Sequence, residues 1–243
     1  MMTLLRWPLS LIFVGQMYVA MLVVGVGYLP LALISPDGAV RACHAYCRWV
    51  RFSLRALCGL HTEIRGTPPQ TQALIAAKHQ SSLDILLIYG ALPRAKFIMK
   101  DLLRYAPILG WYGLRIGCVP VKRGARGAAI TKMMQEVAAG QASPGQLVIY
   151  SQGTRVAPGE VKPYKIGTAV LYAQLGQDCY PVATNAGVLW PKRGILRKPG
   201  VAVVEFLPPI APGLSNADFM ARLEQAVESN SDRLMLEAGW KAS

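Results

Sequence analysis

The distribution of apolar and charged residues separates an N-terminal segment from the rest of the chain. Between Pro8 and Ile34 no residue carries a charge. These 27 residues would extend roughly 40 Å as an α-helix, enough to cross a hydrocarbon core about 30 Å thick. We therefore expect a membrane helix here, and residues 36–38 (PDG) are expected to end it. Pro30 and three glycines leave open a hairpin that enters only one leaflet.

A cleavable signal peptide is the alternative interpretation of this segment, with Arg6 as its basic N-terminal region. The apolar run is too long for the core of a typical signal peptide, and residues 32–34 (ALI) make a poor cleavage site. We therefore favour a retained anchor.

A basic amphipathic pattern follows the apolar run. Five basic positions recur at helical three- and four-residue spacing: Arg41, His44, Arg48, Arg51 and Arg55. With apolar residues on the other side, this pattern predicts a helix that lies on an anionic bilayer surface. A helix that packs its apolar face on the domain and leaves the arginines in solvent is the alternative. The excess of basic residues after the run also predicts that the C-terminal bulk is cytoplasmic.

From about residue 61, short β-like runs alternate with helix-like ones, which indicates an α/β domain. We expect strands at 74–77, 119–122, 147–150, 180–184 and 201–206, and helices at 82–92, 128–139, 167–175 and 216–238. In the last helix, Asp218, Glu224 and Glu228 are expected on the solvent side. Residues 1–60 are thus interpreted as the membrane-associated part and residues 61–243 as one domain.

The net charge of +13 implies attraction to polyanions. Nucleic acid and anionic lipid both fit, but the apolar N-terminus favours lipid, so we expect no nucleic-acid partner. Five cysteines stand at irregular positions. They are interpreted as buried thiols in a reducing compartment and not as metal ligands.

The first candidate for chemistry is residues 79–84, HQSSLD. His79 and Asp84 stand five positions apart, where an apolar strand leads into a helix. Ser81 or Ser82 can cap that helix, and the turn can bring the carboxylate back to the imidazole. A carboxylate that accepts from one ring nitrogen leaves the other nitrogen free to act as a base. Because no serine or cysteine stands in a nucleophile-elbow pattern, the nucleophile would be the substrate's own hydroxyl. A capped helix with an ordinary surface histidine would give the same spacing.

Two further segments could bind an anion. Residues 150–155 (YSQGTR) follow a buried strand; Gly153 permits close backbone approach to a ligand, Thr154 adds a hydroxyl, and Arg155 offers a planar fork suited to phosphate. Lys122 and Arg123 add positive charge at the end of another strand. For each segment, a plain turn with solvated basic side chains is the alternative.

In this order, these segments resemble the motifs of the 1-acyl-sn-glycerol-3-phosphate acyltransferases, the lysophosphatidic acid acyltransferase family. His79 and Asp84 match the first motif, H-x4-D. Residues 117–123 resemble the second motif, and residues 150–155 resemble the third, usually F-P-E-G-T-R. The apolar strand around Pro181 is similar to the fourth.

The resemblance covers roughly residues 61–210 and implies a single mixed-sheet acyltransferase domain flanked by helices and preceded by membrane helices. It implies that His79 is the general base for the sn-2 hydroxyl of lysophosphatidic acid and that Asp84 orients it. The donor would be a thioester of coenzyme A or of acyl carrier protein, with no metal or bound cofactor. The implied substrate-binding residues are Lys122, Arg123, Gln152, Gly153, Thr154 and Arg155.

The same resemblance implies a bacterial-type inner (cytoplasmic) membrane location, with the catalytic domain on the cytoplasmic side. Acyl carrier protein is then a partner if it delivers the donor. A membrane lipid is the substrate, and the anionic membrane surface is a further partner.

Two departures from the motifs bear on the acceptor. Ser151 and Gln152 stand where Pro-Glu is usual, and glutamine keeps the length and hydrogen-bonding capacity but not the charge. Lys122 stands where an acidic residue is frequent. Another lyso-lipid, such as a lyso-ornithine lipid, is therefore the first alternative acceptor. A thioesterase and a non-catalytic protein that binds anionic membranes are further alternatives, and the His79–Asp84 pair argues against the latter.

Overall fold

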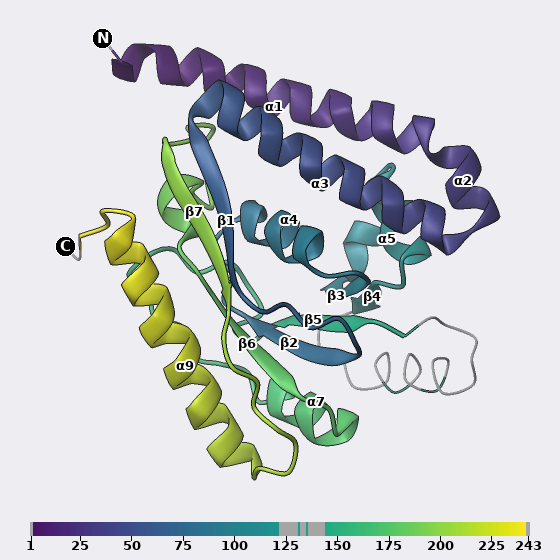
Figure 1. Cartoon of the computed structure of the whole chain (residues 1–243), viewed down its shortest axis with the longest axis vertical. Coiled ribbons are helices and arrows are strands. Elements are labelled where there is room, and N and C mark those ends of the chain that lie inside the picture. The colour runs from purple at the N-terminus through teal and green to yellow at the C-terminus, as the bar shows by residue number, and fades with distance from the viewer. Residues whose placement is uncertain (1, 122–130, 132–134, 136–143, 242–243) are drawn as a thin grey trace.

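The apolar runs in the middle of the chain form the inner strands of a mixed sheet (Figure 1). The computed structural model describes residues 2–121, 131, 135 and 144–241. Within them the strand order is β1-β7-β6-β2-β5-β3-β4. The strands are β1 (Leu60–Gly66), β2 (Ala73–Ala77), β3 (Ala95–Lys100), β4 (Val119–Val121), β5 (Gln146–Tyr150), β6 (Cys179–Thr184) and β7 (Gly200–Phe206).

The strand directions bring the candidate motifs to one edge of the sheet. β6, β2, β5, β3 and β4 run parallel to one another, whereas β7 is antiparallel to β6 and β1 is parallel to β7. The carboxyl ends of β2, β5 and β6 therefore open on the same edge, where open α/β sheets bind their ligands. The first, third and fourth motifs begin at or run along these three strands.

Helices cover both faces of the sheet (Figure 1). They are α1 (Met2–Gly27), α2 (Leu29–Ile34), α3 (Pro36–Cys58), α4 (Ser82–Ala91), the 3-10 helix η1 (Asp101–Tyr105), α5 (Leu109–Arg115), α7 (Gly167–Leu175), α8 (Ala186–Leu189) and α9 (Asn216–Glu237). Ile75 and Ala77 of β2 pack in one apolar core with α3 and α4, and Leu74 and Ala76 in a second core with α7 and α9. This alternation is the period of two of a strand buried on both faces.

The N-terminal segment folds back on itself. α1 and α3 run side by side, and the short α2 joins them at one end (Figure 1). As expected, the helical run ends just before residues 36–38, at Ile34, but these residues also begin α3: Ser35 accepts a hydrogen bond from the Asp37 N–H, and Pro36 lies in the first turn. A Cβ on Gly38 would lie 2.3 Å from the Leu31 backbone, so glycine lets α3 approach α2 this closely.

The two long N-terminal helices expose different surfaces. Within the described residues, α1 is the one helix long and apolar enough to cross a membrane, from Leu5 to Gly27. The apolar face of α3 packs against α1, α4 and β1, as the alternative interpretation expected. Arg41, Arg48 and Arg55 remain exposed on its other side. The N-terminal hairpin thus presents apolar side chains from α1 and basic ones from α3.

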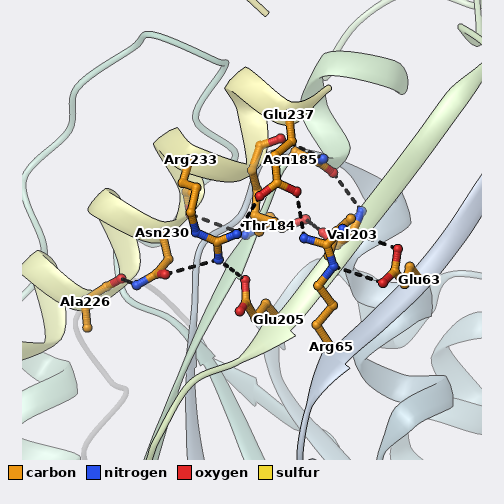
Figure 2. Close-up of polar contacts among 12 residues, drawn as sticks. Glu63, Arg65, Thr184, Asn185, Val203, Glu205, Ala226, Asn230, Arg233 and Glu237 are labelled. Carbon is orange, nitrogen blue, oxygen red and sulfur yellow. Dashed lines mark hydrogen bonds and ion pairs between the residues drawn. The ribbon is translucent and has the colours of Figure 1, made fainter. Parts of the chain in front are cut away.

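At the far side of the sheet, ion pairs fasten α9 to β1 and β7 (Figure 2). Arg65 Nη1 lies 2.7 Å from Glu237 Oε2, and Arg233 Nη1 lies 2.6 Å from Glu237 Oε1. Arg65 also pairs with Glu63, and Arg233 with Glu205. We call these five residues the α9 ion cluster. It holds the C-terminal end of α9 against the sheet.

Candidate active site

The first motif lies where β2 passes into α4. Ser81 caps α4, since its Oγ accepts from the Leu83 N–H at 3.1 Å. Asp84 in the first turn reaches back, and its Oδ2 accepts from the backbone N–H groups of Gln80 at 2.8 Å and Ser81 at 2.7 Å. This reciprocal capping fixes the carboxylate beside the strand end. Of the two serines that the sequence offered as caps, the structure uses Ser81.

The same carboxylate orients the histidine. His79 Nδ1–H donates to Asp84 Oδ1 at 2.8 Å. The Asp84 side chain is fully buried, whereas the imidazole is 13% exposed. Because Nδ1 carries the proton in this pair, Nε2 keeps its lone pair and is the nitrogen that can act as a base. The pairing predicted from the spacing is thus present in the geometry.

Tyr150 completes the surroundings of the dyad. Its hydroxyl donates to Asp84 Oδ1 at 3.1 Å, and its ring stacks on His79 with centroids 3.9 Å apart. Burial and the neighbouring Asp84 charge raise the Tyr150 pKa well above its ordinary value, so the hydroxyl remains a donor. Asp84 thereby accepts four hydrogen bonds, the full capacity of a carboxylate. Sequence reasoning did not foresee this role, although a tyrosine at the usual phenylalanine of the third motif was a signal.

Residues 151–155 form the third-motif loop, which is tied directly to the first motif. The Val156 N–H donates to the His79 carbonyl at 2.7 Å. Gly153 has φ +69°, where side chains are disfavoured, and its N–H donates to the Tyr150 carbonyl at 2.8 Å to close the turn. Lys165 covers this turn, since its Nζ would lie 2.8 Å from a Cβ on Gly153. This lysine adds a cation that the motifs did not indicate.

Arg155 lies beside the start of α4. Its Nη1 donates to Ser82 Oγ at 3.2 Å and lies 3.5 Å from the Lys192 carbonyl oxygen. Neither partner is an anion, so the guanidinium keeps its charge for a ligand. The structure therefore brings Arg155 to the motif that carries His79.

The other predicted binding residues are placed differently. Thr154 is exposed in the third-motif loop. Gln152 is buried, and its Nε2 donates to the Lys162 carbonyl at 3.1 Å on the side of α9. Lys122 and Arg123 lie outside the described residues, as does the helix expected at 128–139 apart from positions 131 and 135. β4 ends at Val121 on the same edge as the carboxyl ends of β2 and β5.

One prediction about the last helix holds only in part, since the Glu228 side chain is 33% exposed. Glu228 was expected on the solvent side of α9, but both its carboxylate oxygens contact Lys78 Nζ, at 2.8 and 2.6 Å. Lys78 immediately precedes His79 and is buried. Helical periodicity could not reveal a partner 150 residues away in the chain.

Across the described part of the chain, His, Cys, Asp and Glu side chains nowhere gather in a group of three that could hold a metal ion.

Comparisons with known proteins agree with this geometry. A family model described as Acyltransferase matches residues 61–185. The 1-acyl-sn-glycerol-3-phosphate acyltransferase of Pseudomonas aeruginosa is 25% identical over 194 residues, which cover 79% of this chain and 76% of that protein. The corresponding alpha enzyme of Mus musculus is 28% identical over 172 residues, 68% of this chain, and the match spans only 60% of the mouse protein.

A solved structure shares the fold over its whole length. The crystal structure of the 1-acyl-sn-glycerophosphate (LPA) acyltransferase PlsC from Thermotoga maritima aligns with a TM-score of 0.78 and 21% identity, covering 100% of both chains. The α/β fold expected from the sequence is thus confirmed. With the family match spanning more than half of the chain, including both members of the His79–Asp84 dyad, the chain belongs to the acyltransferase family and is an acyltransferase enzyme.

Proposed function

We propose that the chain transfers a fatty acyl group from an acyl thioester to the sn-2 hydroxyl of lysophosphatidic acid, making phosphatidic acid for phospholipid biosynthesis. The observation that carries the proposal is the position of Arg155. Its guanidinium contacts Ser82, in the same six-residue motif as His79 and Asp84. A phosphate-binding group thus stands next to a general base, as an acceptor with both a phosphate and a free hydroxyl requires.

The dyad accounts for the chemical step. The acceptor hydroxyl oxygen attacks the thioester carbonyl carbon while His79 Nε2 takes the hydroxyl proton, and a new C–O bond forms. When the tetrahedral intermediate collapses, the carbon–sulfur bond breaks and the imidazolium returns the proton to the departing thiolate. Asp84 stabilises the imidazolium between these transfers through its 2.8 Å hydrogen bond. The products are an ester and a free thiol, and His79 is neutral again.

The proposed acceptor site is cationic. Arg155 would hold the phosphate bidentately. Gly153 and Thr154 would shape the pocket, and Lys122 and Arg123 would add charge from the end of β4. Gln152 would support the third-motif loop from behind. In this proposal the reaction needs no metal or bound cofactor, because the donor thioester already supplies an activated acyl group.

An apolar α1 suits attachment to a membrane, which is where the lipid acceptor resides. Exposed side chains along α1 and α2 include Leu11, Leu22, Val26, Leu31 and Ile34. We place them in the cytoplasmic leaflet of a bacterial-type inner membrane, with the catalytic domain on the cytoplasmic side. The exposed arginines of α3 would then lie near anionic headgroups. Coenzyme A or acyl carrier protein would deliver the donor from the cytoplasm.

An acceptor panel tests the reaction and the headgroup together. Purified protein in detergent is given labelled acyl-coenzyme A or acyl carrier protein with lysophosphatidic acid, lyso-ornithine lipid or no acceptor. We expect labelled phosphatidic acid at the highest rate, and none with His79→Ala, which should still bind vesicles. Faster acylation of lyso-ornithine lipid would assign the other acceptor, and free fatty acid formed equally without a lyso-lipid would indicate a thioesterase.

Arg155 can be tested separately from the base. Arg155→Ala should raise the KM for lysophosphatidic acid about 10- to 100-fold, as expected for the loss of a charge-assisted hydrogen bond, and leave the donor KM within about twofold. Arg222→Ala, an exposed arginine on α9, is the matched control. Equal effects of Arg155→Ala on both KM values would remove Arg155 from phosphate binding.

A further inference from the structure

A buried lysine stands directly before the proposed base. Lys78 is 3% exposed, and its N–H donates to the Val182 carbonyl, which extends the pairing of β2 with β6. Because successive residues of an extended chain point to opposite faces, Lys78 leaves the sheet on the side opposite to His79. That side is covered by α7 and α9. A buried ammonium group is costly unless a partner neutralises it.

Glu228 of α9 is that partner, and it does more than neutralise the lysine. Besides the two contacts with Lys78 Nζ, its Oε1 accepts from the Tyr164 hydroxyl at 2.8 Å. The same oxygen lies 3.5 Å from Gln152 Nε2. One carboxylate thus joins the residue before His79, the third-motif loop and the segment that leads into α7. We call Lys78, Gln152, Tyr164 and Glu228 the rear cluster.

The rear cluster fixes the orientation of Gln152. Its Nε2 faces two acceptors, the Lys162 carbonyl and Glu228 Oε1, so the amide nitrogen must point towards α9. A glutamate at this position would direct carboxylate oxygens at the same two acceptors. With glutamine, the rear cluster holds one cation and one anion. Gln152, which departs from the usual third motif, can therefore donate to the Glu228 carboxylate that α9 supplies.

We infer that Glu228 is a positioning residue for acyl transfer, which keeps Arg155 at the correct distance from His79 by holding the third-motif loop against Lys78. The loop is then fixed on two sides, by the Val156–His79 backbone hydrogen bond in front and by Glu228 behind. α9 can impose this position because Phe219, Leu223 and Val227 pack it into the second apolar core, while the α9 ion cluster adds exposed pairs near its C-terminal end (Figure 2). The inference rests on the proposed function, in which Arg155 binds the acceptor phosphate.

Glu228→Gln tests the inference, with Glu224→Gln as the matched control, since Glu224 is exposed one turn earlier on α9. Glu228→Gln should lower kcat/KM for lysophosphatidic acid about 10-fold or more, mainly through the acceptor KM, with the donor KM within about twofold. Glu224→Gln should be unchanged. Tyr164→Phe removes one hydrogen bond and no charge, and should give a smaller loss in the same direction. Full activity of Glu228→Gln, or equal losses for acceptor and donor, would overturn the inference.

A charge exchange separates positioning from general stability. Gln152→Glu places a second carboxylate beside Glu228 and should lower activity by itself. Combined with Glu228→Gln, it restores one anion to the rear cluster, and we expect kcat/KM to recover to within about threefold of the wild type. Losses that simply multiply in the double variant would show no coupling and contradict the inference. Each variant is compared with the wild type on the acceptor that the wild type acylates fastest. If that acceptor is not lysophosphatidic acid, the acceptor panel with the wild type shows it, and the comparison between variants remains valid.

Discussion

The dyad and the α9 ion cluster are both built from charged side chains, but they differ in burial. Asp84 is fully buried and accepts four hydrogen bonds. In the α9 ion cluster the side chains are 20–48% exposed. Removing one partner from a buried carboxylate leaves an unsatisfied group, whereas water replaces a lost partner at the surface. The loss of one polar contact should therefore lower the free energy of unfolding much more at Asp84 than in the α9 ion cluster.

The two regions also differ in role: the dyad takes part in the reaction, whereas the α9 ion cluster only supports the fold. The dyad lies between the end of β2 and the first turn of α4, and Tyr150 at the end of β5 packs against it, so its geometry depends on the buried core. The α9 ion cluster joins the outer strands β1 and β7 to α9. It can affect the site only through the position of α9. We expect substitutions in the first region to change catalysis and those in the second to change little.

Asp84→Asn should have the largest effect. The neutral amide cannot stabilise the imidazolium. Its NH2 group is a donor, so in the position of Oδ2 it could not accept from the backbone N–H groups of Gln80 and Ser81. We expect kcat to fall about 10²- to 10⁴-fold, the usual contribution of general acid–base catalysis, with acceptor KM within about threefold. Steady-state kinetics measure both values.

The double variant His79→Ala/Asp84→Asn serves as the control for this prediction. Because both residues act in one proton transfer, it should lose no more activity than His79→Ala alone. A kcat of Asp84→Asn within tenfold of the wild type would instead mean that Asp84 only caps α4.

Tyr150→Phe should have an intermediate effect. The ring that stacks on His79 remains, but Asp84 Oδ1 loses one of its two donors. We expect a loss of about 1 kcal/mol in the free energy of unfolding and a decrease in kcat of a few fold. Tyr150→Leu, which also removes the stack, should lose more of both. Equal effects of the two substitutions would show that the ring contributes nothing to the position of His79.

The pH dependence of stability gives a second measurement of Tyr150. Its pKa in the folded chain is raised, first by burial and then by the Asp84 charge. A raised folded pKa means that stability is full below the unfolded pKa of about 10 and declines as the pH rises above it. Between pH 10 and 11 the wild type should therefore lose up to about 1.4 kcal/mol per pH unit more than Tyr150→Phe. Identical slopes in denaturant titrations would place the Tyr150 hydroxyl in water.

Residues close in sequence were the ones whose arrangement could be predicted. The apolar runs at 74–77 and 147–150 gave β2 and β5 nearly to the residue, and Ser81 and Asp84 lie within one helical turn. β1 escaped prediction because Leu60 and Ile64 are its only apolar residues and give no alternating pattern, so only pairing with β7 makes it a strand. Glu228 escaped because its contact with Lys78 is a product of tertiary packing.

Arg233→Ala should have the smallest effect and is the strictest test of the comparison. It removes two ion pairs from the α9 ion cluster, with Glu205 and Glu237. Because exposed pairs contribute little, we expect the melting temperature to fall by less than about 2 °C and activity to be unchanged.

High salt should reduce the difference between the wild type and Arg233→Ala, whereas acid should weaken the Arg65–Glu237 pair in both proteins. Screening weakens exposed ion pairs, so the difference in melting temperature should shrink in 1 M NaCl. The Glu237 pKa is lowered, first by Arg65, so its contribution to stability is present above the ordinary glutamate value and is lost as the pH falls below it. If Arg233→Ala lowered activity as much as Tyr150→Phe, the α9 ion cluster would be controlling the site through α9, and burial alone would no longer separate the two regions.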